Sequence, residues 1–188
     1  DITKRRVQEE RLAFLGEMVD RAPASITLHD TEGNFIYVNR ETLRLHGYSE
    51  EEFLSINLKE LDVPESVELI EERMRLIIEK GEASFDSAHF HRDGSVIPVH
   101  VVAKKLDWKG RPAFMSIATD IRERKEAEEA LRENEEFTRT VMDNLPIGLA
   151  VNSVDPCIFS YINEKFIETY RTTRDAICRY DSFWESVY

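Results

Sequence analysis

Histidine is the residue type in this chain with the clearest potential for chemistry, and His89, His91 and His100 lie close together in sequence. If Asp93-Gly94 forms a two-residue turn between two strands, these three imidazoles share the outer face of the hairpin. Their expected neighbours on that face are Ser87, Val96 and Pro98. Three imidazoles could bind a metal ion. Because the group contains no Cys, Asp or Glu, a polar outer surface is the simpler interpretation, and we predict no metal site.

Other reactive residue types form no catalytic pattern. Cys157 and Cys178 match no zinc-ligand spacing and cannot build a disulfide framework, so we expect reduced thiols. Glu128 and Glu129 lie in a run of charges, where they are better explained as a solvated helix face than as an acid/base pair. The sequence has no glycine-rich phosphate loop, HExxH motif, nucleophile elbow or kinase catalytic set. We therefore predict that this stretch of chain is not an enzyme.

The charge balance restricts the partners of the chain. Its 188 residues include 25 Lys and Arg against 37 Asp and Glu, a formal net charge of -12, with 41% apolar residues. Polyanions would be repelled by this charge, so we predict no nucleic-acid partner. No apolar run approaches the ~18 residues of a membrane span, and the charged N-terminus does not resemble a signal peptide. We expect a cytoplasmic protein with enough apolar residues for a core and no direct membrane insertion.

The sequence contains an internal repeat. Asp1-Ile2 matches Asp120-Ile121, and Tyr37-Val38-Asn39 matches Tyr161-Ile162-Asn163, at an offset of roughly 120 residues, which is the size of a small domain. A charged stretch without Gly or Pro separates the copies and predicts a helix. We expect the second copy to be truncated and the chain to be a fragment of a longer protein. The predicted parts are a linker helix at 1–21 with the tail of a preceding copy at 1–3, a complete domain at 22–120, a connecting helix at 121–138 and the first half of a second domain at 139–188.

Local patterns predict the order of elements in the complete copy. Helix-permissive residues cover 4–20, and alternation around a turn predicts a hairpin over 24–38. Asn39 and Gly47 bracket a short helix, Ser49 and Glu52 have capping-box spacing, and a longer helix is expected over 64–80. Period-two patterns then predict strands at 83–91, 96–106 and 113–119. Strands first, helices next and strands last predict an α+β domain, with a five-stranded antiparallel sheet covered on one face by short helices and flanked by linker helices.

This order closely resembles the PAS sensory domain family. The resemblance rests on the Tyr-Val-Asn before the first short helix and on three longer segments. These segments are Gly47-Tyr48-Ser49-Glu50-Glu51-Glu52, His91-Arg92-Asp93-Gly94-Ser95, and Thr119-Asp120-Ile121 with the following Arg122-Glu123-Arg124-Lys125. The similarity covers residues 22–125, and the segment from about Phe137 resembles the first half of another PAS domain. It implies a cytosolic input module, which in this family often belongs to a sensor histidine kinase and often dimerises.

The resemblance also bears on cofactors. Haem-binding PAS domains use a His on the long helix, and residues 64–80 contain none, which argues against haem. Photoactive flavin domains use an Asn-Cys-Arg-Phe motif, whereas this chain has only Ile177-Cys178-Arg179-Tyr180 in the second copy. Neither cofactor is expected, and the ligand itself remains open.

A sheet half-covered by helices leaves a concave space that could hold a small molecule. With the two-residue turn, Ala88 and Phe90 share the inner face with Ile97, Val99 and Val101. The predicted pocket residues are Leu28, Tyr37, Leu43, Tyr48, Phe53, Ile77, Phe90, Ile97, Val99 and Phe114. The alternative is that these large side chains simply fill the space as a core. In that case the domain would bind no ligand and would serve as a dimerisation or spacer module.

The output of such a module is expected at the helix that leaves the last strand. In the family, the Asp at the end of this strand commonly pairs with a basic residue, here Arg122, Arg124 or Lys125, and the resemblance therefore implies that Asp120 and these residues relay the signal. Farther along, an imperfect coiled-coil seam could support a homodimer. The seam consists of Ala127, Leu131, Asn134, Thr138 and Val141. A single solvated helix explains the same run equally well.

Overall fold

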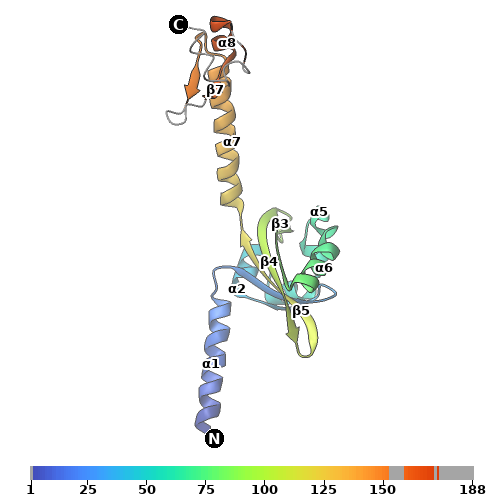
Figure 1. Ribbon diagram of the computed structural model, residues 1–188. Helices are drawn as coiled ribbons and strands as arrows, with labels where there is room; N and C mark the ends of the chain where they lie inside the picture. The colour runs from blue at the N-terminus through green and yellow to red at the C-terminus, as the bar shows by residue number, and fades with distance from the viewer. Residues whose placement is uncertain (1, 153–158, 172, 174–188) are drawn as a thin grey trace. The chain divides into compact units, whose positions relative to one another are not determined.

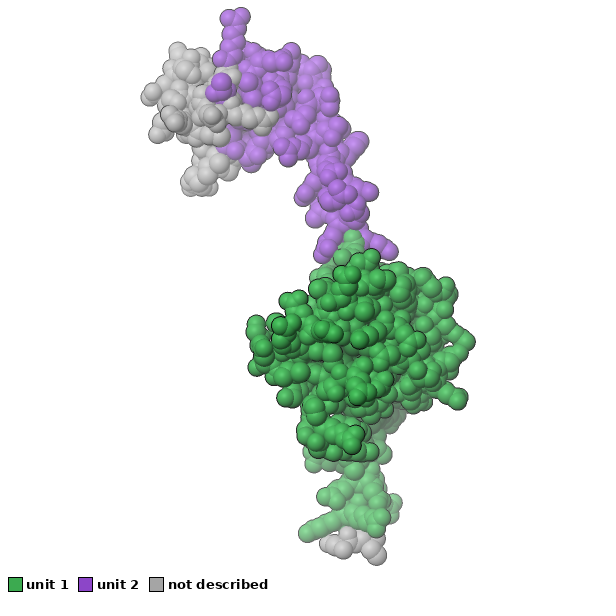
Figure 2. Space-filling model, turned by 90° about the vertical axis from the view of Figure 1, so that its right-hand side faces the viewer, with its two compact units in different colours: residues 1–125 green, residues 126–188 purple. Residues whose placement is uncertain are grey.

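The computed structural model describes residues 2–152, 159–171 and 173. The chain divides into two compact units, residues 1–125 and 126–188, which are coloured separately in Figure 2. Cys157 and Cys178, which we expect to be reduced thiols, lie outside the described residues. In the part of the chain that is described, no helix is both long and apolar enough to cross a bilayer.

The first unit is built around a five-stranded antiparallel sheet with the order β2-β1-β5-β4-β3. Its strands are β1 (Ser25–Asp30), β2 (Phe35–Val38), β3 (Glu82–Phe90), β4 (Val96–Trp108) and β5 (Arg111–Asp120). The first and last strands lie side by side at the centre, because β1 pairs with β5 along its whole length. This sheet, with its helices, confirms the predicted α+β fold.

Short helices follow the first hairpin and cover one face of the sheet (Figure 1). They are α2 (Arg40–His46), α3 (Glu50–Ser55), α4 (Leu58–Leu61), α5 (Pro64–Val67) and α6 (Ile70–Lys80), preceded by α1 (Ile2–Asp20). The capping box of Ser49 and Glu52 is present as predicted. The single helix predicted over 64–80 was wrong, because the chain leaves the helix at residues 68–69 and divides it into α5 and α6. Helix α4 was not predicted, although Asn57 and Glu60 form a second capping box.

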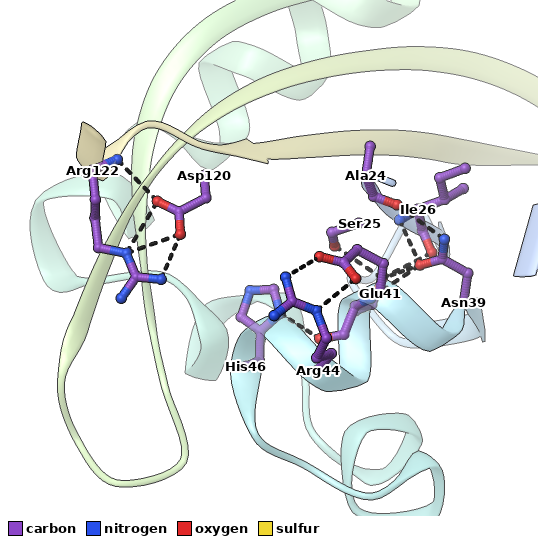
Figure 3. A network of polar contacts seen from close by, with 10 residues as sticks. Ala24, Ser25, Ile26, Asn39, Glu41, Arg44, His46, Asp120 and Arg122 are labelled. Atoms are coloured by element: carbon purple, nitrogen blue, oxygen red, sulfur yellow. Dashed lines mark hydrogen bonds and ion pairs between the residues drawn. The ribbon is translucent and has the colours of Figure 1, made fainter. Parts of the chain in front are cut away.

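The side chain of Asn39 joins three elements of the first unit, and Figure 3 shows it beside Ala24 and Ile26. Its Oδ1 caps α2 by accepting from Thr42 N at 3.0 Å, and also accepts from Ile26 N at 2.9 Å. Its Nδ2 donates to the carbonyl oxygens of Val19 and Ala24, each at 3.0 Å. Because Asn39 is 0% exposed, water cannot replace these bonds. The amide therefore fixes the end of α1 and the start of β1 to α2.

The second unit repeats this arrangement. Helix α7 (Arg122–Asp143) runs past residue 138, where the connecting helix was expected to end, and is followed by β6 (Ala150–Asn152), β7 (Phe159–Ile162) and α8 (Glu164–Tyr170). Asn163 Oδ1 accepts from Leu149 N and Phe166 N, while its Nδ2 donates to the carbonyl oxygens of Met142 and Ile147. Both asparagines thus tie a preceding helix, a hairpin and a following helix together.

We expect Asn39→Ala to lower the free energy of unfolding of the first unit by about 3 kcal/mol, because it removes a helix cap and leaves buried backbone groups unpaired. Asn39→Asp keeps the cap acceptor but turns an acceptor oxygen toward the two carbonyl oxygens, and should destabilise the unit at least as much. Chemical denaturation of the 188-residue chain measures both. Asn134→Ala is the control, since exposed Asn134 only accepts from Thr138 Oγ1. Equal stability of Asn39→Ala and the control would contradict the role assigned to Asn39.

Candidate functional site

A cavity of about 60 Å³ lies between the helices and the inner face of the sheet. Its apolar wall comes from both layers and includes Ile70, Met74, Ile77, Val101 and Ala103. Polar side chains also reach it, because strand alternation turns Ser25, Thr27 and His29 of β1 toward the helices. The combination of an apolar wall with a few polar groups is typical of a small-molecule site.

Three buried side chains form a chain of polar contacts in the cavity wall. His46, in the last turn of α2, places Nδ1 at 2.8 Å from the carbonyl oxygen of Thr42 and Nε2 at 3.0 Å from His89 Nδ1. The His89 Nε2 lies 3.2 Å from Asp62 Oδ1. The exposed fractions of His46, His89 and Asp62 are 1%, 7% and 6%. The chain therefore links α2, β3 and the residue that ends α4 without access to bulk water.

Burial controls the ionisation of two histidines in the wall. Desolvation, assisted by the neighbouring His89, lowers the pKa of His46 to about 4. Burial likewise lowers the pKa of His29, whose ring stacks on Phe114 at a centroid distance of 5.4 Å. The His29 Nδ1 lies 2.9 Å from the Asp30 carbonyl oxygen, which opposes this lowering. Near neutral pH both imidazoles are therefore uncharged.

A second polar branch leaves Asp62 toward α5 and α6. Ser87 Oγ lies 3.5 Å from Asp62 Oδ1 and 3.0 Å from Ser66 Oγ. Arg73 donates to Ser87 Oγ and to the Asp86 carbonyl oxygen, each at 3.2 Å, and its guanidinium stacks over Phe85 at 4.1 Å. Polar contacts thus extend along the cavity wall from helix α2 to helix α6.

The structure separates the ten predicted pocket residues into groups. Ile77 lines the cavity. Ile97, Val99 and Phe114 face inward but belong to the packed core, and Leu43, Tyr48 and Phe53 pack in a second apolar cluster around α3. Strand alternation places Leu28, Tyr37 and Phe90 on the opposite face of the sheet, where Tyr37 is 37% exposed. Large side chains therefore fill much of the predicted pocket, and the cavity lies beside them.

The face assigned to β3 was wrong. Phe90 pairs with Val96, whereas the predicted two-residue turn would have paired Phe90 with Ile97. The loop between the strands instead has Gly94 in the left-handed region, with φ 86, and His91 N bonds to Ser95 O. One extra loop residue shifts the register by one and turns every β3 side chain to the other face. Ser87 and His89 therefore point into the cavity, and Ala88 and Phe90 point away from it.

The three histidines that could have shared an outer face are consequently apart. His89 lies in the cavity wall, while His100 stays on the outer face with Asp86, at 2.7 Å between Nδ1 and Oδ1. His91 lies in the loop, 2.8 Å from Asp93 Oδ1 and against Gly47. In the described residues, no group of three or more His, Cys, Asp or Glu is placed to hold a metal ion.

Two of the wall residues had no usable signal in the sequence. His46 was treated only as part of a short helix, although its spacing from Thr42 places both on one buried face of α2. Asp62 ends a helix that the sequence patterns did not reveal. Each of these two residues reaches His89 only through tertiary packing, which no pattern of neighbouring residues reveals.

Asp120 lies at the junction between β5 and α7, as expected (Figure 3). Its carboxylate accepts from Arg122 N at 2.9 Å and from the Arg122 guanidinium at 2.5–3.1 Å. These bonds from Arg122 lower the pKa of Asp120 below its usual value. Arg124 reaches Asp86 on β3 instead, at 2.8 Å, and Lys125 is exposed in the same helical turn. The first turn of α7 is thus bonded to the end of β5 and to the middle of β3.

The low pKa of His46 predicts that the free energy of unfolding depends on pH. Between pH 6.5 and about 4, His46 is protonated in the unfolded chain but neutral in the folded protein. The contribution of His46 to the free energy of unfolding is therefore complete above pH 6.5 and is lost as the pH falls. We expect this histidine alone to remove about 3 kcal/mol of unfolding free energy across that range. Urea denaturation from pH 7 to 4.5 measures it. His46→Gln should lose less stability over the same range, and parallel curves would contradict the prediction.

Comparison with known proteins identifies relatives of the first unit. A family model described as a PAS domain matches residues 23–123. The methyl sulfide methyltransferase-associated sensor of Methanosarcina acetivorans is 34% identical over 101 residues, covering 54% of this chain and 10% of that protein. Sensor histidine kinase TmoS of Ectopseudomonas mendocina is 23% identical over 143 residues, covering 70% of this chain and 14% of that protein. The chain thus spans a small part of the length of these relatives.

Solved structures share the fold. A PAS domain of an HTR-like protein from Haloarcula marismortui has a TM-score of 0.59 and 24% identity, covering 64% of this chain and 100% of that one. A PAS domain from a two-component sensor histidine kinase has a TM-score of 0.54 and 23% identity, covering 60% of this chain and 98% of that one. With the family match over residues 23–123 and this sheet and helix order, the chain belongs to the PAS domain family, the sensory domains of signalling proteins such as sensor histidine kinases.

Proposed function

We propose that residues 22–120 are the cytosolic input module of a longer signalling protein, with a sensor histidine kinase as the favoured parent, and that the cavity binds a small ligand. The observation that carries this proposal is the path of β5. This strand contributes Ser116 and Ala118 to the cavity wall and then continues through Asp120 into α7. If the domain has two conformations that differ in the position of β5, a ligand that binds one of them more tightly would shift the population of α7 orientations.

The size and lining of the cavity support a small polar molecule. About 60 Å³ compares with the roughly 10–15 Å³ that a cavity needs to hold one water, and with roughly 300–1,000 Å³ for pockets of drug-sized ligands. The wall offers hydroxyl groups from Ser25, Thr27 and Ser116 beside the imidazoles. These features do not favour haem or flavin, in agreement with the missing family motifs.

A matched pair of substitutions tests the ligand site. Ala103→Leu places a larger side chain in the cavity wall, whereas Val102→Leu enlarges the neighbouring residue on the other face of β4. In a thermal-shift screen of small polar molecules, we expect a compound that raises the melting temperature of the parent chain and of Val102→Leu. Ala103→Leu should lose that shift, since its cavity is filled. A compound that stabilises all three equally would place the site elsewhere.

The relay through α7 has its own test. Asp120→Ala removes the capping carboxylate of α7 and should cost only ~0–1 kcal/mol of stability, because the ion pair is partly exposed. In the full-length parent we expect this variant to fold and to lose its response to the stimulus. Glu82→Ala, which removes the exposed pair with Lys104, is the control. A normal response in the folded Asp120→Ala variant would argue against the relay.

A second candidate, a ligand-free dimerisation or spacer module, is supported by exposed apolar residues on both linker helices. On α1, Leu12 is 68% exposed and Phe14 is 61% exposed, and on α7 the seam residue Leu131 is 61% exposed. Analytical ultracentrifugation distinguishes the candidates. A homodimer that Leu131→Glu dissociates, together with no ligand in the screen above, would favour the dimerisation module.

We also propose that the second unit begins another PAS domain. The support is the set of four bonds at Asn163, which repeats the set at Asn39 in a different sequence context. A tandem arrangement of this kind would let α7 leave one sensory domain and enter the next.

A further inference from the structure

Arg73 carries the least exposed positive charge among the described lysines and arginines. Every other Lys and Arg in that part of the chain is exposed, whereas Arg73 is half-buried and lines the cavity. Its guanidinium lies 4.1 Å from the ring centre of Phe85, another wall residue. Burial lowers the pKa of Arg73, and the negative charges of Asp62 and Glu72 only partly oppose this effect. A partly desolvated cation therefore lies beside the cavity.

The charge of Arg73 is not paired with a carboxylate. Its guanidinium donates to two neutral oxygens, Ser87 Oγ and the Asp86 carbonyl oxygen, each at 3.2 Å. Although the sequence has 37 Asp and Glu, Arg73 forms no ion pair within the described chain. A guanidinium has more N–H donors than these two bonds use, so Arg73 can still bind a further acceptor.

Helix α6 itself cannot supply the missing anion. On a helix surface, the side chains three and four positions away are the neighbours that could pair with an arginine. Around Arg73 all of these neighbours are apolar. They are Leu69, Ile70, Leu76 and Ile77. The unpaired charge is thus built into the sequence of the helix and does not depend on a particular rotamer of a nearby acid.

The rest of the wall fits an apolar group beside this cation. Met74, Ile77 and Val101 line the same cavity. Its volume of about 60 Å³ would hold about four to six water-sized groups, at roughly 10–15 Å³ for each. The short-chain carboxylates from acetate to butyrate have a comparable number of non-hydrogen atoms. Their planar anionic end matches a guanidinium, and their tail matches the apolar side chains.

Asp62 limits the negative charge that the cavity can accept. Among the described residues it is the only Asp or Glu in the wall, and Arg73 is the only Lys or Arg. Burial keeps His29 and His46 uncharged near neutral pH, so these imidazoles do not add positive charge. Because Asp62 repels each negative charge of a ligand, the wall favours a monocarboxylate over a dicarboxylate.

We propose that the cavity ligand is a short-chain monocarboxylate, whose carboxylate binds Arg73 and whose tail contacts Met74, Ile77 and Val101. This inference rests on the ligand site proposed above and assigns the chemical class of its ligand. A carboxylate that competes for the guanidinium would change the bonds from Arg73 to β3. On the same strand, the Asp86 carboxylate accepts from Arg124 of α7 at 2.8 Å, so the change would be close to the output helix.

Titration of the 188-residue chain with sodium propionate at pH 7 tests the class of ligand, with sodium chloride as the reference for ionic strength. We expect propionate to raise the melting temperature and to shift the Arg73 Nε–H signal in NMR spectra. Propionamide has a similar shape without the charge, and should bind more weakly by about tenfold or more. Malonate, which carries a second carboxylate, should also bind more weakly. Equal binding of propionate and propionamide, or no binding by any carboxylate from acetate to butyrate, would overturn the inference.

A matched pair of substitutions on α6 tests the residue. Arg73→Gln removes the charge in the wall, whereas Arg75→Gln removes an exposed charge from the same helix. We expect propionate to bind Arg73→Gln about tenfold more weakly or worse, and to bind Arg75→Gln as it binds the parent. Retained binding by folded Arg73→Gln would contradict the assignment. If Arg73→Gln does not fold, the Arg73 signal of the parent decides.

The inference and the sensory function can fail separately. A neutral compound that stabilises the parent but not Ala103→Leu, together with no effect of propionate, would overturn the carboxylate assignment and leave the ligand site in place. If neither the carboxylates nor the compounds of the wider screen bind the cavity, both proposals are wrong.

Discussion

The pairing of Phe90 with Val96 decides which side chains of β3 and β4 face the helices, and the cavity depends on it. Side chains alternate along a strand, so a shift of one residue would exchange the two faces of β3. In the observed register, Ser87 and His89 meet the helices, and Ala88 and Phe90 lie on the outer face. The polar wall of the cavity therefore follows from a loop whose Gly94 takes a backbone conformation that other residues rarely adopt.

Once His89 points inward, the remaining polar groups of the wall are constrained by the need to pair every buried donor and acceptor. No buried side-chain nitrogen or oxygen lacks a partner in the described residues. His46 comes from α2, Asp62 from the end of α4, and Ser66 from α5, so three separate helices are held to β3 by polar contacts. The position of the short helices on the sheet thus depends on directional bonds as well as on apolar packing.

Polar contacts connect the domain to the helix on either side of it. Asn39 bonds the last turn of α1 to the hairpin and α2, and Asp120 bonds β5 to the first turn of α7. Asn39 is buried and its bonds are shielded from water, whereas the Asp120 pair is partly exposed and contributes little to stability. A partly exposed junction can change geometry at a low cost in free energy, which is compatible with the relay proposed above.

The sequence alone was sufficient for the order of elements and for the fold class. Alternation in the strands, the caps at Asn39 and Ser49 and the resemblance to PAS domains depend on local chemistry, which neighbouring residues largely determine. The end of β5 at Asp120 was also predictable, while the resemblance left Arg122, Arg124 and Lys125 as possible partners, of which the structure brings Arg122 to the carboxylate. The composition of the cavity wall was decided by the tertiary structure. His46 and His89 are separated by 43 positions, and no local pattern relates either of them to Asp62. Their contact requires the loop length that sets the register of β3 and a short helix that ends at Asp62, and a change of one residue in either would separate them. Large apolar residues such as Phe53 and Phe114 were predicted as cavity lining but fill the core, because hydrophobicity predicts burial and does not indicate where packing leaves space.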